Sequence, residues 1–130
     1  MKAKTYYISR NNNVTATRTG QSNESTRCVV YTIELDPSVT REPAFAAKNP
    51  RHIPGKPCFY VGMTTLQPEE RFAQHITGSK NASRIAHKYG KKLRMDVVEN
   101  NKPVPRTWAL EREKRVANKL RSQGFGAWKG

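Results

Sequence analysis

Five side chains of this sequence have the types and the spacing that chemistry requires. Tyr31 and Tyr60 each lie within a short apolar run, where a phenol is rarely placed without a reason. Arg71 and His75 follow the second run and are four residues apart, so a helix would bring them onto one face. Glu113 lies further along the chain, among apolar residues. Together these side chains indicate a site rather than a packed core.

A helix predicted over residues 105–122 would carry Glu113. Its apolar residues recur at helical spacing: Ala109, Val116, Ala117 and Leu120. Glu113 lies four residues after Ala109 and four before Ala117, so it falls inside the apolar stripe, whereas Glu111 points to another side. A carboxylate in such a stripe costs free energy unless it is paired, protonated or bound to a cation. Glu113 is therefore the acid that calls for a cation or a partner.

The other four side chains need shorter elements to position them. Apolar and β-branched residues predict strands over 28–35 and 58–62, and a third strand over 93–99. A helix is expected to begin near Pro68, which suits a first helical position, and to end at Gly78. A second short helix is expected over 82–89.

Two segments are predicted to lack regular structure. Residues 37–57 contain five of the eight prolines, and this density predicts a long loop. Residues 1–27 are polar and predict a flexible N-terminal arm with a short extended piece at 5–8. The remaining chain, 28–130, is expected to form one domain.

The charge of the chain favours a polyanionic partner. The sequence has 24 Lys and Arg against 10 Asp and Glu, a net charge of +14. Residues 1–70 carry a net +3, and residues 71–130 carry a net +11. Nucleic acid is the first candidate, through phosphate contacts that do not depend on sequence. The expected phosphate-contacting run is Lys80, Arg84, Lys88, Lys91, Lys92 and Arg94.

The composition argues against other classes of protein. No apolar stretch reaches the roughly eighteen residues of a membrane span, and the first residues lack the apolar core of a signal peptide. The prediction is a protein that is not secreted and does not bind membranes, in the cytoplasm or another compartment that contains nucleic acid. Cys28 and Cys58 are too few for a structural zinc site, and reduced core thiols are expected.

The order of these motifs resembles the GIY-YIG endonuclease family over roughly residues 28–121. Val29-Val30-Tyr31 stands where the first motif would be, with Val29 in place of its glycine, and Tyr60-Val61-Gly62 stands where the second would be. Arg71 and His75 are similar to the family's helix with its arginine and histidine. Ala109 followed four residues later by Glu113 is similar to the last motif. The Pro-rich stretch departs from the family, which usually has a short hairpin turn there.

This resemblance implies an α+β fold, with a small three-stranded antiparallel sheet flanked by helices, and metal-dependent hydrolysis of phosphodiester bonds in DNA. Glu113 would bind Mg²⁺, or Mn²⁺ in its place. Arg71 would contact the scissile phosphate, because a planar guanidinium matches two oxygens. Tyr31 would act as general base or would position the water, with Tyr60 beside it. Base work near neutrality requires a lowered tyrosine pKa, and His75 would assist as a group that titrates near neutrality.

Two functions of other classes stay open. The first is a non-catalytic basic module of the same fold, which would bind nucleic acid in a salt-sensitive manner without cleaving it. The second is a small accessory protein of an RNA assembly, for which RNA would compete better than DNA. The position of Glu113 inside the apolar stripe of the predicted helix favours the nuclease over both.

Overall fold

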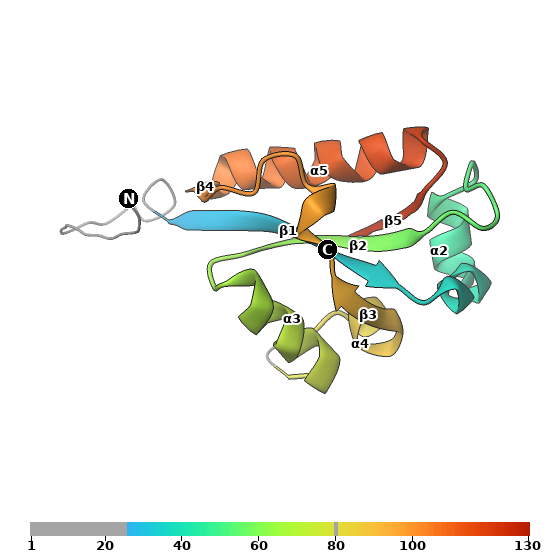
Figure 1. The fold of residues 1–130 in the computed structure, drawn as a ribbon, viewed down its shortest axis with the longest axis horizontal. Coiled ribbons are helices and arrows are strands. Elements are labelled where there is room, and N and C mark those ends of the chain that lie inside the picture. Colours follow the sequence, from blue (N-terminus) through green and yellow to red (C-terminus); the bar gives the residue numbers. More distant parts are fainter. Residues whose placement is uncertain (1–25, 80) are drawn as a thin grey trace, which may run out of the picture.

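The computed structural model describes residues 26–79 and 81–130; the piece expected at 5–8 and Lys80 lie outside the described residues. The chain forms a mixed five-stranded sheet, with helices on both faces (Figure 1). Its strands are β1 (Arg27–Leu35), β2 (Cys58–Thr64), β3 (Gly90–Leu93), β4 (Val104–Pro105) and β5 (Gly126–Lys129). Its helices are η2 (Pro37–Arg41), α2 (Pro43–Lys48), α3 (Pro68–Thr77), α4 (Arg84–Tyr89), η3 (Met95–Val97) and α5 (Arg106–Ser122). The predicted α+β class is confirmed.

The sheet has five strands, two more than the sequence predicts. Three antiparallel strands, β3, β1 and β2, do lie side by side, but β5 adds to β2 in parallel and β4 pairs with the start of β1. The chain reaches β5 after α5 has crossed the sheet, which is the connection that a parallel pair requires. The four-residue β5 gives little local sequence signal, and its place depends on packing against β2.

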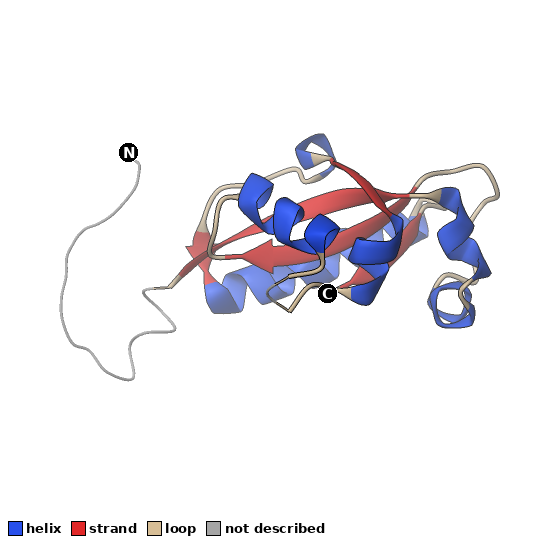
Figure 2. Ribbon diagram, turned by 90° about the horizontal axis from the view of Figure 1, so that it is seen from below, coloured by secondary structure: helices blue, strands red, loops and turns tan. Residues whose placement is uncertain are grey.

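The sheet separates two apolar cores. One core holds Val30 and Phe59 together with Ala109 and Ala117 of α5. The other holds Tyr31, Ile33 and Tyr60 together with residues of α2 and α4. Successive residues of a strand point to opposite faces, so β1 supplies both cores in alternation. Figure 2 shows the sheet as a layer with helices in front of and behind it.

The helices that follow β2 begin and end near the proline, serine and glycine residues that predict helix ends. Pro68 begins α3, and Gln67 and Glu70 form a capping box around its first turn. Gly78 ends α3 in the left-handed conformation, at φ 79°, which favours glycine. Ser83 caps α4 by accepting a hydrogen bond from the Ala86 N–H. The helices predicted from Pro68 and over 105–122 are therefore confirmed, and the helix predicted over 82–89 begins two residues later.

Two predictions about local structure were wrong. Residues 37–57 are not all loop, since Pro37 and Pro43 occupy first-turn positions of η2 and α2, where the missing proline N–H costs nothing. The third strand lies at Gly90–Leu93 rather than over 93–99. Val97 and Val98, which prompted that prediction, pack instead into the core beneath α5.

Two further predictions concern thiols and membranes. Cys28 and Cys58 are both free and buried, as expected for core thiols. Within the described residues, none of the helices combines the length and apolar character needed to cross a bilayer.

Candidate functional site

The two tyrosines of the predicted site lie together on the α3 side of the sheet. The pairing of β1 with β2 sets Tyr31 opposite Gly62, so Tyr31 and Tyr60 are diagonal neighbours with ring centroids 6.2 Å apart. Both rings are buried. A Cβ at position 62 would lie 2.7 Å from the Tyr31 hydroxyl oxygen and 2.9 Å from Cε1 of Tyr60. Gly62 therefore leaves the space that both phenols fill.

His75 joins the tyrosines through a hydrogen bond whose direction the structure fixes. Its ring is fully buried, with Nε2 at 2.8 Å from the Tyr31 hydroxyl oxygen. The backbone N–H of Ser83 donates to Nδ1 at 3.1 Å. Because Nδ1 accepts, a neutral ring carries its hydrogen on Nε2 and donates it to Tyr31. The tyrosine keeps its own hydroxyl hydrogen for another acceptor.

The expectation that His75 titrates near neutrality was wrong. Burial, with a smaller contribution from the Arg71 charge, lowers the pKa of His75 to about 4. At pH 7 the ring is neutral and does not readily accept a proton, so it is a poor proton shuttle. His75 is hydrogen-bonded to Tyr31, and its ring centroid lies 5.1 Å from that of Tyr60, which makes it a positioning residue.

Arg71 stands at the open side of this cluster. Its guanidinium donates to Oε1 of Gln74 at 2.7 Å and to the backbone oxygen of Asn81 at 3.1 Å. Its charge lowers the pKa of Tyr31, though less than burial raises it. A cavity of about 450 Å³ opens beside Arg71, and Gln74, Asn81 and Arg106 also line it. Two guanidinium groups at one cavity make it suitable for an anion such as a phosphate.

The phenols themselves are neutral at pH 7. Burial and the neighbouring Tyr60 raise the pKa of Tyr31. Burial and the charge of Glu113 raise the pKa of Tyr60. The shift of Tyr31 is opposite to the one that a general base requires, so of the two predicted roles the arrangement favours positioning of water by a neutral hydroxyl.

Glu113 lies on α5, which packs against the opposite face of the sheet, and only 3% of it is exposed. It falls between Ala109 and Ala117, as its spacing predicted. Burial raises the pKa of Glu113 to about 7, although Lys129 and Arg106 act in the opposite direction. Its charge still reaches Tyr60. The structure thus brings Tyr31, Tyr60, Arg71 and His75 together, whereas Glu113 packs on the other face of the sheet and acts on them through the effect of its charge on the pKa of Tyr60.

No local sequence pattern indicates the partner of Glu113. Nζ of Lys129, in β5, lies 3.6 Å from Oε1 of Glu113. The pairing depends on β5 joining β2, a contact that no local pattern encodes. The sequence reasoning also missed Arg106, the first residue of α5, which acts electrostatically on Glu113. Helical periodicity could have indicated Arg106, because it lies seven residues before Glu113 and hence on the same side.

The carboxylate of Glu113 fits a hard cation as a single protein ligand. Within the described residues, no group of three or more His, Cys, Asp and Glu side chains could hold a metal ion together. Mg²⁺ in enzymes is bound through one or two carboxylates together with waters and substrate phosphates, so Glu113 would be the protein ligand of such an ion. The Lys129 side chain, which now supplies the positive charge beside Glu113, is 44% exposed.

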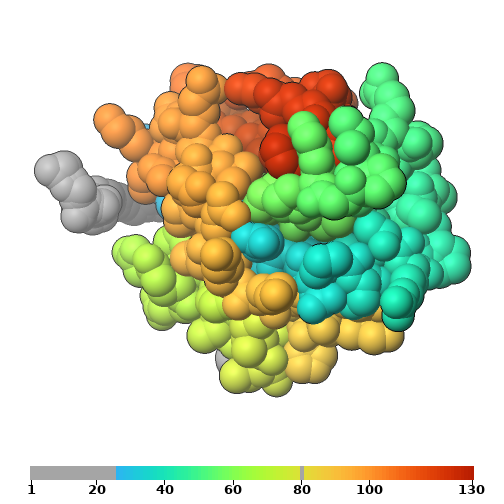
Figure 3. Space-filling model, turned by 45° about the vertical axis from the view of Figure 1, so that its right-hand side comes forward, coloured from blue at the N-terminus to red at the C-terminus, as the bar shows by residue number. Residues whose placement is uncertain are grey.

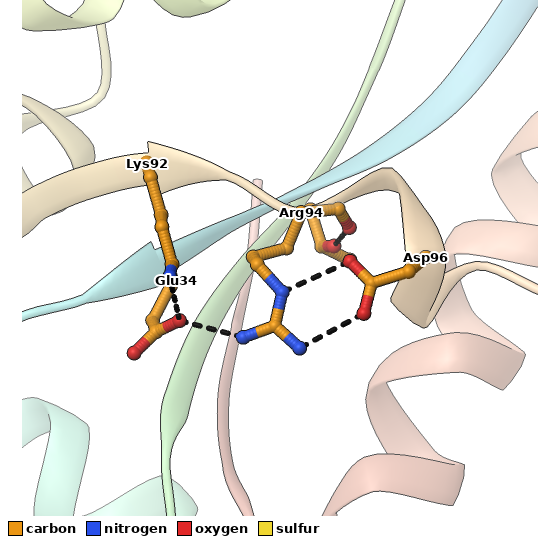
Figure 4. Close-up of polar contacts among 5 residues, drawn as sticks. Glu34, Lys92, Arg94 and Asp96 are labelled. Atoms are coloured by element: carbon orange, nitrogen blue, oxygen red, sulfur yellow. Dashed lines mark hydrogen bonds and ion pairs between the residues drawn. The ribbon is translucent and has the colours of Figure 1, made fainter.

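The predicted phosphate-contacting run is largely engaged in ion pairs. Arg84 and Lys88 both contact Glu42, at 3.1 and 3.6 Å. Lys92 and Arg94 contact Glu34, and Arg94 also contacts Asp96 at 2.9 Å, as Figure 4 shows. In the described part of the chain, Lys91 is the member of the run for which there is no such ion pair. This face is less positive than its sequence suggests.

The opposite pKa shifts of His75 and Glu113 predict that these two groups together leave stability nearly unchanged between pH 7 and pH 5. Below about pH 6.5 the unfolded chain protonates His75 before the folded protein does, which costs stability as pH falls. The folded protein protonates Glu113 first, from about pH 7, which adds stability as pH falls. Each contribution amounts to about 2 kcal/mol between pH 7 and pH 5, so they nearly cancel.

The variant Glu113→Gln removes one of the two contributions. We expect it to lose about 2 kcal/mol of unfolding free energy from pH 7 to pH 5, whereas the wild type changes by less than about 1 kcal/mol. Urea unfolding at the two pH values, in buffer with a chelator, measures this difference. A Glu113→Gln variant as insensitive to pH as the wild type would contradict the assigned shifts.

Comparison with known proteins adds no relative. No family model, curated protein or solved structure matches the chain.

Proposed function

We propose that this protein is a metal-dependent endonuclease that hydrolyses phosphodiester bonds in DNA. The observation that carries the proposal is the hydrogen-bonded pair of Tyr31 and His75 next to Arg71, whose side chain lines a cavity. The charge of Glu113 acts on the neighbouring Tyr60. A phosphodiesterase needs a positioned water, a cation at the phosphoryl oxygens and support for the leaving oxygen. These side chains match those needs.

Each residue has a role that follows from its surroundings. Arg71 would bind the phosphate at the mouth of the cavity, with Arg106 as a second positive charge. Tyr31 would donate its hydroxyl hydrogen to the attacking water and hold it, because His75 already donates to the Tyr31 oxygen. Glu113 would hold Mg²⁺ or Mn²⁺, which when bound supplies positive charge to the phosphate. Burial of Tyr31, His75 and Glu113 keeps the dielectric around them low, which strengthens their electrostatic contacts.

One observation favours the non-catalytic alternative. Glu113 already has Lys129 as its cation, and burial keeps Tyr31 protonated. A module that binds nucleic acid through the same cavity needs nothing more. The two functions differ in one measurable respect, which is strand cleavage.

Incubation of the purified protein with supercoiled, branched and single-stranded DNA distinguishes them. With Mg²⁺ or Mn²⁺ we expect broken strands, and with a chelator we expect intact DNA. Binding that weakens with salt, without cleavage under either metal, would instead support the non-catalytic module.

Removal of one hydroxyl tests the role of Tyr31. We expect Tyr31→Phe to reduce the cleavage rate by about a hundredfold, the lower end of what positioned proton donors contribute. Tyr89→Phe is the matched control, because the Tyr89 hydroxyl donates to Glu42, whereas the Tyr31 hydroxyl accepts a hydrogen bond from His75. Equal cleavage rates for the two variants would remove Tyr31 from the site. Urea unfolding of both variants shows whether a lost buried hydrogen bond, worth about 1–3 kcal/mol, explains any loss.

A further inference from the structure

We propose that the outer side of α5 and the groove beside it bind a single-stranded segment of nucleic acid, which makes an unpaired strand part of the substrate. This inference rests on the proposed function, because it names the substrate class of the same protein. It arises from a surface that shares only Arg94 with the predicted phosphate-contacting run.

One stripe of α5 carries an exposed aromatic ring and three cations. Trp108, Arg112, Arg115 and Lys119 are spaced by four, three and four residues, so they share one side of the helix. Trp108 is 64% exposed, the largest exposure among the large apolar side chains that the structure describes. From Trp108 to Lys119 the stripe runs roughly 16 Å along the helix axis.

A groove of about 760 Å³ follows this stripe. α5 forms one side of it, and residues 94–100 form the other; Figure 3 shows this face, with residues 94–100 in orange and the C-terminal part of α5 in red. Its apolar lining residues are Phe59, Val97, Val98, Val116, Leu120 and Phe125. Arg112, Arg115 and Lys119 add positive charge to the same groove, where Arg94 is already paired with Glu34 and Asp96 and where Glu99 adds one negative charge. An apolar surface bordered by cations suits a ligand with both flat apolar groups and negative charges.

The cations of the stripe are less neutralised than those of the predicted run. Arg112 donates to the backbone oxygens of Asn100 and Lys102 and not to a carboxylate. Within the described chain, the side chain of Arg115 has no hydrogen bond or ion pair. Lys119 contacts Glu99 at 3.8 Å, and both side chains are mostly exposed, so a phosphate can replace that carboxylate.

The combination favours a single strand over a duplex. A duplex presents phosphates but keeps the faces of its bases stacked inside, where an apolar groove cannot reach them. A single strand presents phosphates and base faces together, and bases stack on exposed aromatic side chains. Trp108 supplies such a platform at one end of the stripe.

The stripe begins near the end of α5 that carries part of the candidate site. Arg106, which lines the cavity beside Arg71, precedes Trp108 by two residues at the start of α5. Residues two apart point to different sides of a helix, so a strand bound at Arg71 and Arg106 would cross the N-terminal end of α5 to reach Trp108 and then continue along the stripe. The scissile bond would lie next to unpaired nucleotides.

Binding without metal separates this proposal from the catalytic one. We would measure the anisotropy of a labelled oligo(dT) of ~15 nucleotides, within the range of known single-strand sites, and of a duplex of equal length, in buffer with a chelator. We expect the single strand to bind tighter than the duplex and Trp108→Ala to weaken its binding about tenfold. In a Trp128→Phe background, where Trp108 is the remaining indole, bound oligo(dT) should quench the fluorescence.

Charge variants on one helix test the stripe itself. Arg115→Gln should weaken oligo(dT) binding and reduce the dependence of log K on log salt by about 0.7, the value for one phosphate contact of a single strand. Lys114→Gln removes the same charge from another side of α5 and should change the slope less. Equal effects of the two variants, preference for duplex, or no Trp108 quenching would each overturn the proposal. Stronger competition by an acidic peptide than by unlabelled oligo(dT) would overturn it in favour of a protein partner. None of these outcomes depends on cleavage, which tests the proposed function.

Discussion

Gly62→Ala is expected to destabilise the protein by about 1–3 kcal/mol, although it adds a single methyl group. The added carbon would lie 2.7 Å from the Tyr31 hydroxyl oxygen and 2.8 Å from its Cζ. Both tyrosine rings are buried, and His75 packs against each of them, so neither can move aside freely. Elsewhere in a strand the same change gains about 0.5–1 kcal/mol, because alanine restricts the backbone. Here the contact outweighs that gain.

A second substitution shows whether the contact is the cause. In a Tyr31→Phe background the nearest atom is missing, so Gly62→Ala should cost less than it does in the wild type. Urea unfolding of the wild type, the two single variants and the double variant gives the coupling energy. Strictly additive losses would mean that the Tyr31 hydroxyl is not part of the clash. A Gly62→Ala variant as stable as the wild type would mean that the phenols are not held against Gly62. The rate at which the Gly62→Ala variant cleaves DNA should fall together with its stability.

The sequence predicts those parts of the fold whose signals are local. The helix α3 lies between a proline that suits its first turn and a glycine that suits its end, and both signals act within one element. The periodicity of α5 likewise predicts that Glu113 is a buried acid, without reference to its partner. Tyr31 and Tyr60 are predicted from the apolar runs of the two strands that carry them, and these strands pair directly.

The parts that were missed depend on contacts between distant segments. Lys129 reaches Glu113 because β5 adds to β2, and Ser83 orients His75 because α4 follows α3 closely. The pKa of His75 falls because tertiary packing buries its ring. Carboxylates from elsewhere in the chain, Glu42 and Glu34, pair with most of the predicted phosphate-contacting cations. Counting charges along the chain does not reveal such pairs.

Glu113→Gln is expected to have the largest effect on activity, a loss of about a hundredfold or more in the cleavage rate. Glutamine keeps the shape of the side chain but lacks the negative charge that would hold the cation. The exchange also removes a buried charge whose raised pKa already shows that burial disfavours it. The folded protein should therefore remain intact at pH 7, and the loss should be one of chemistry.

Glu111→Gln is the matched control for this variant. It removes the same charge from the same helix, but Glu111 is exposed and lies outside the apolar stripe. Circular dichroism and urea unfolding at pH 7 should show all three proteins folded.

Nicking of supercoiled plasmid with Mg²⁺ by the wild type, Glu113→Gln and Glu111→Gln tests the central claim most directly. We predict nicking by the wild type and by Glu111→Gln, almost none by Glu113→Gln, and none by any of the three with a chelator. Nicking by Glu113→Gln at the wild-type rate, or nicking that continues with the chelator, would contradict the claim that Glu113 holds a catalytic metal ion.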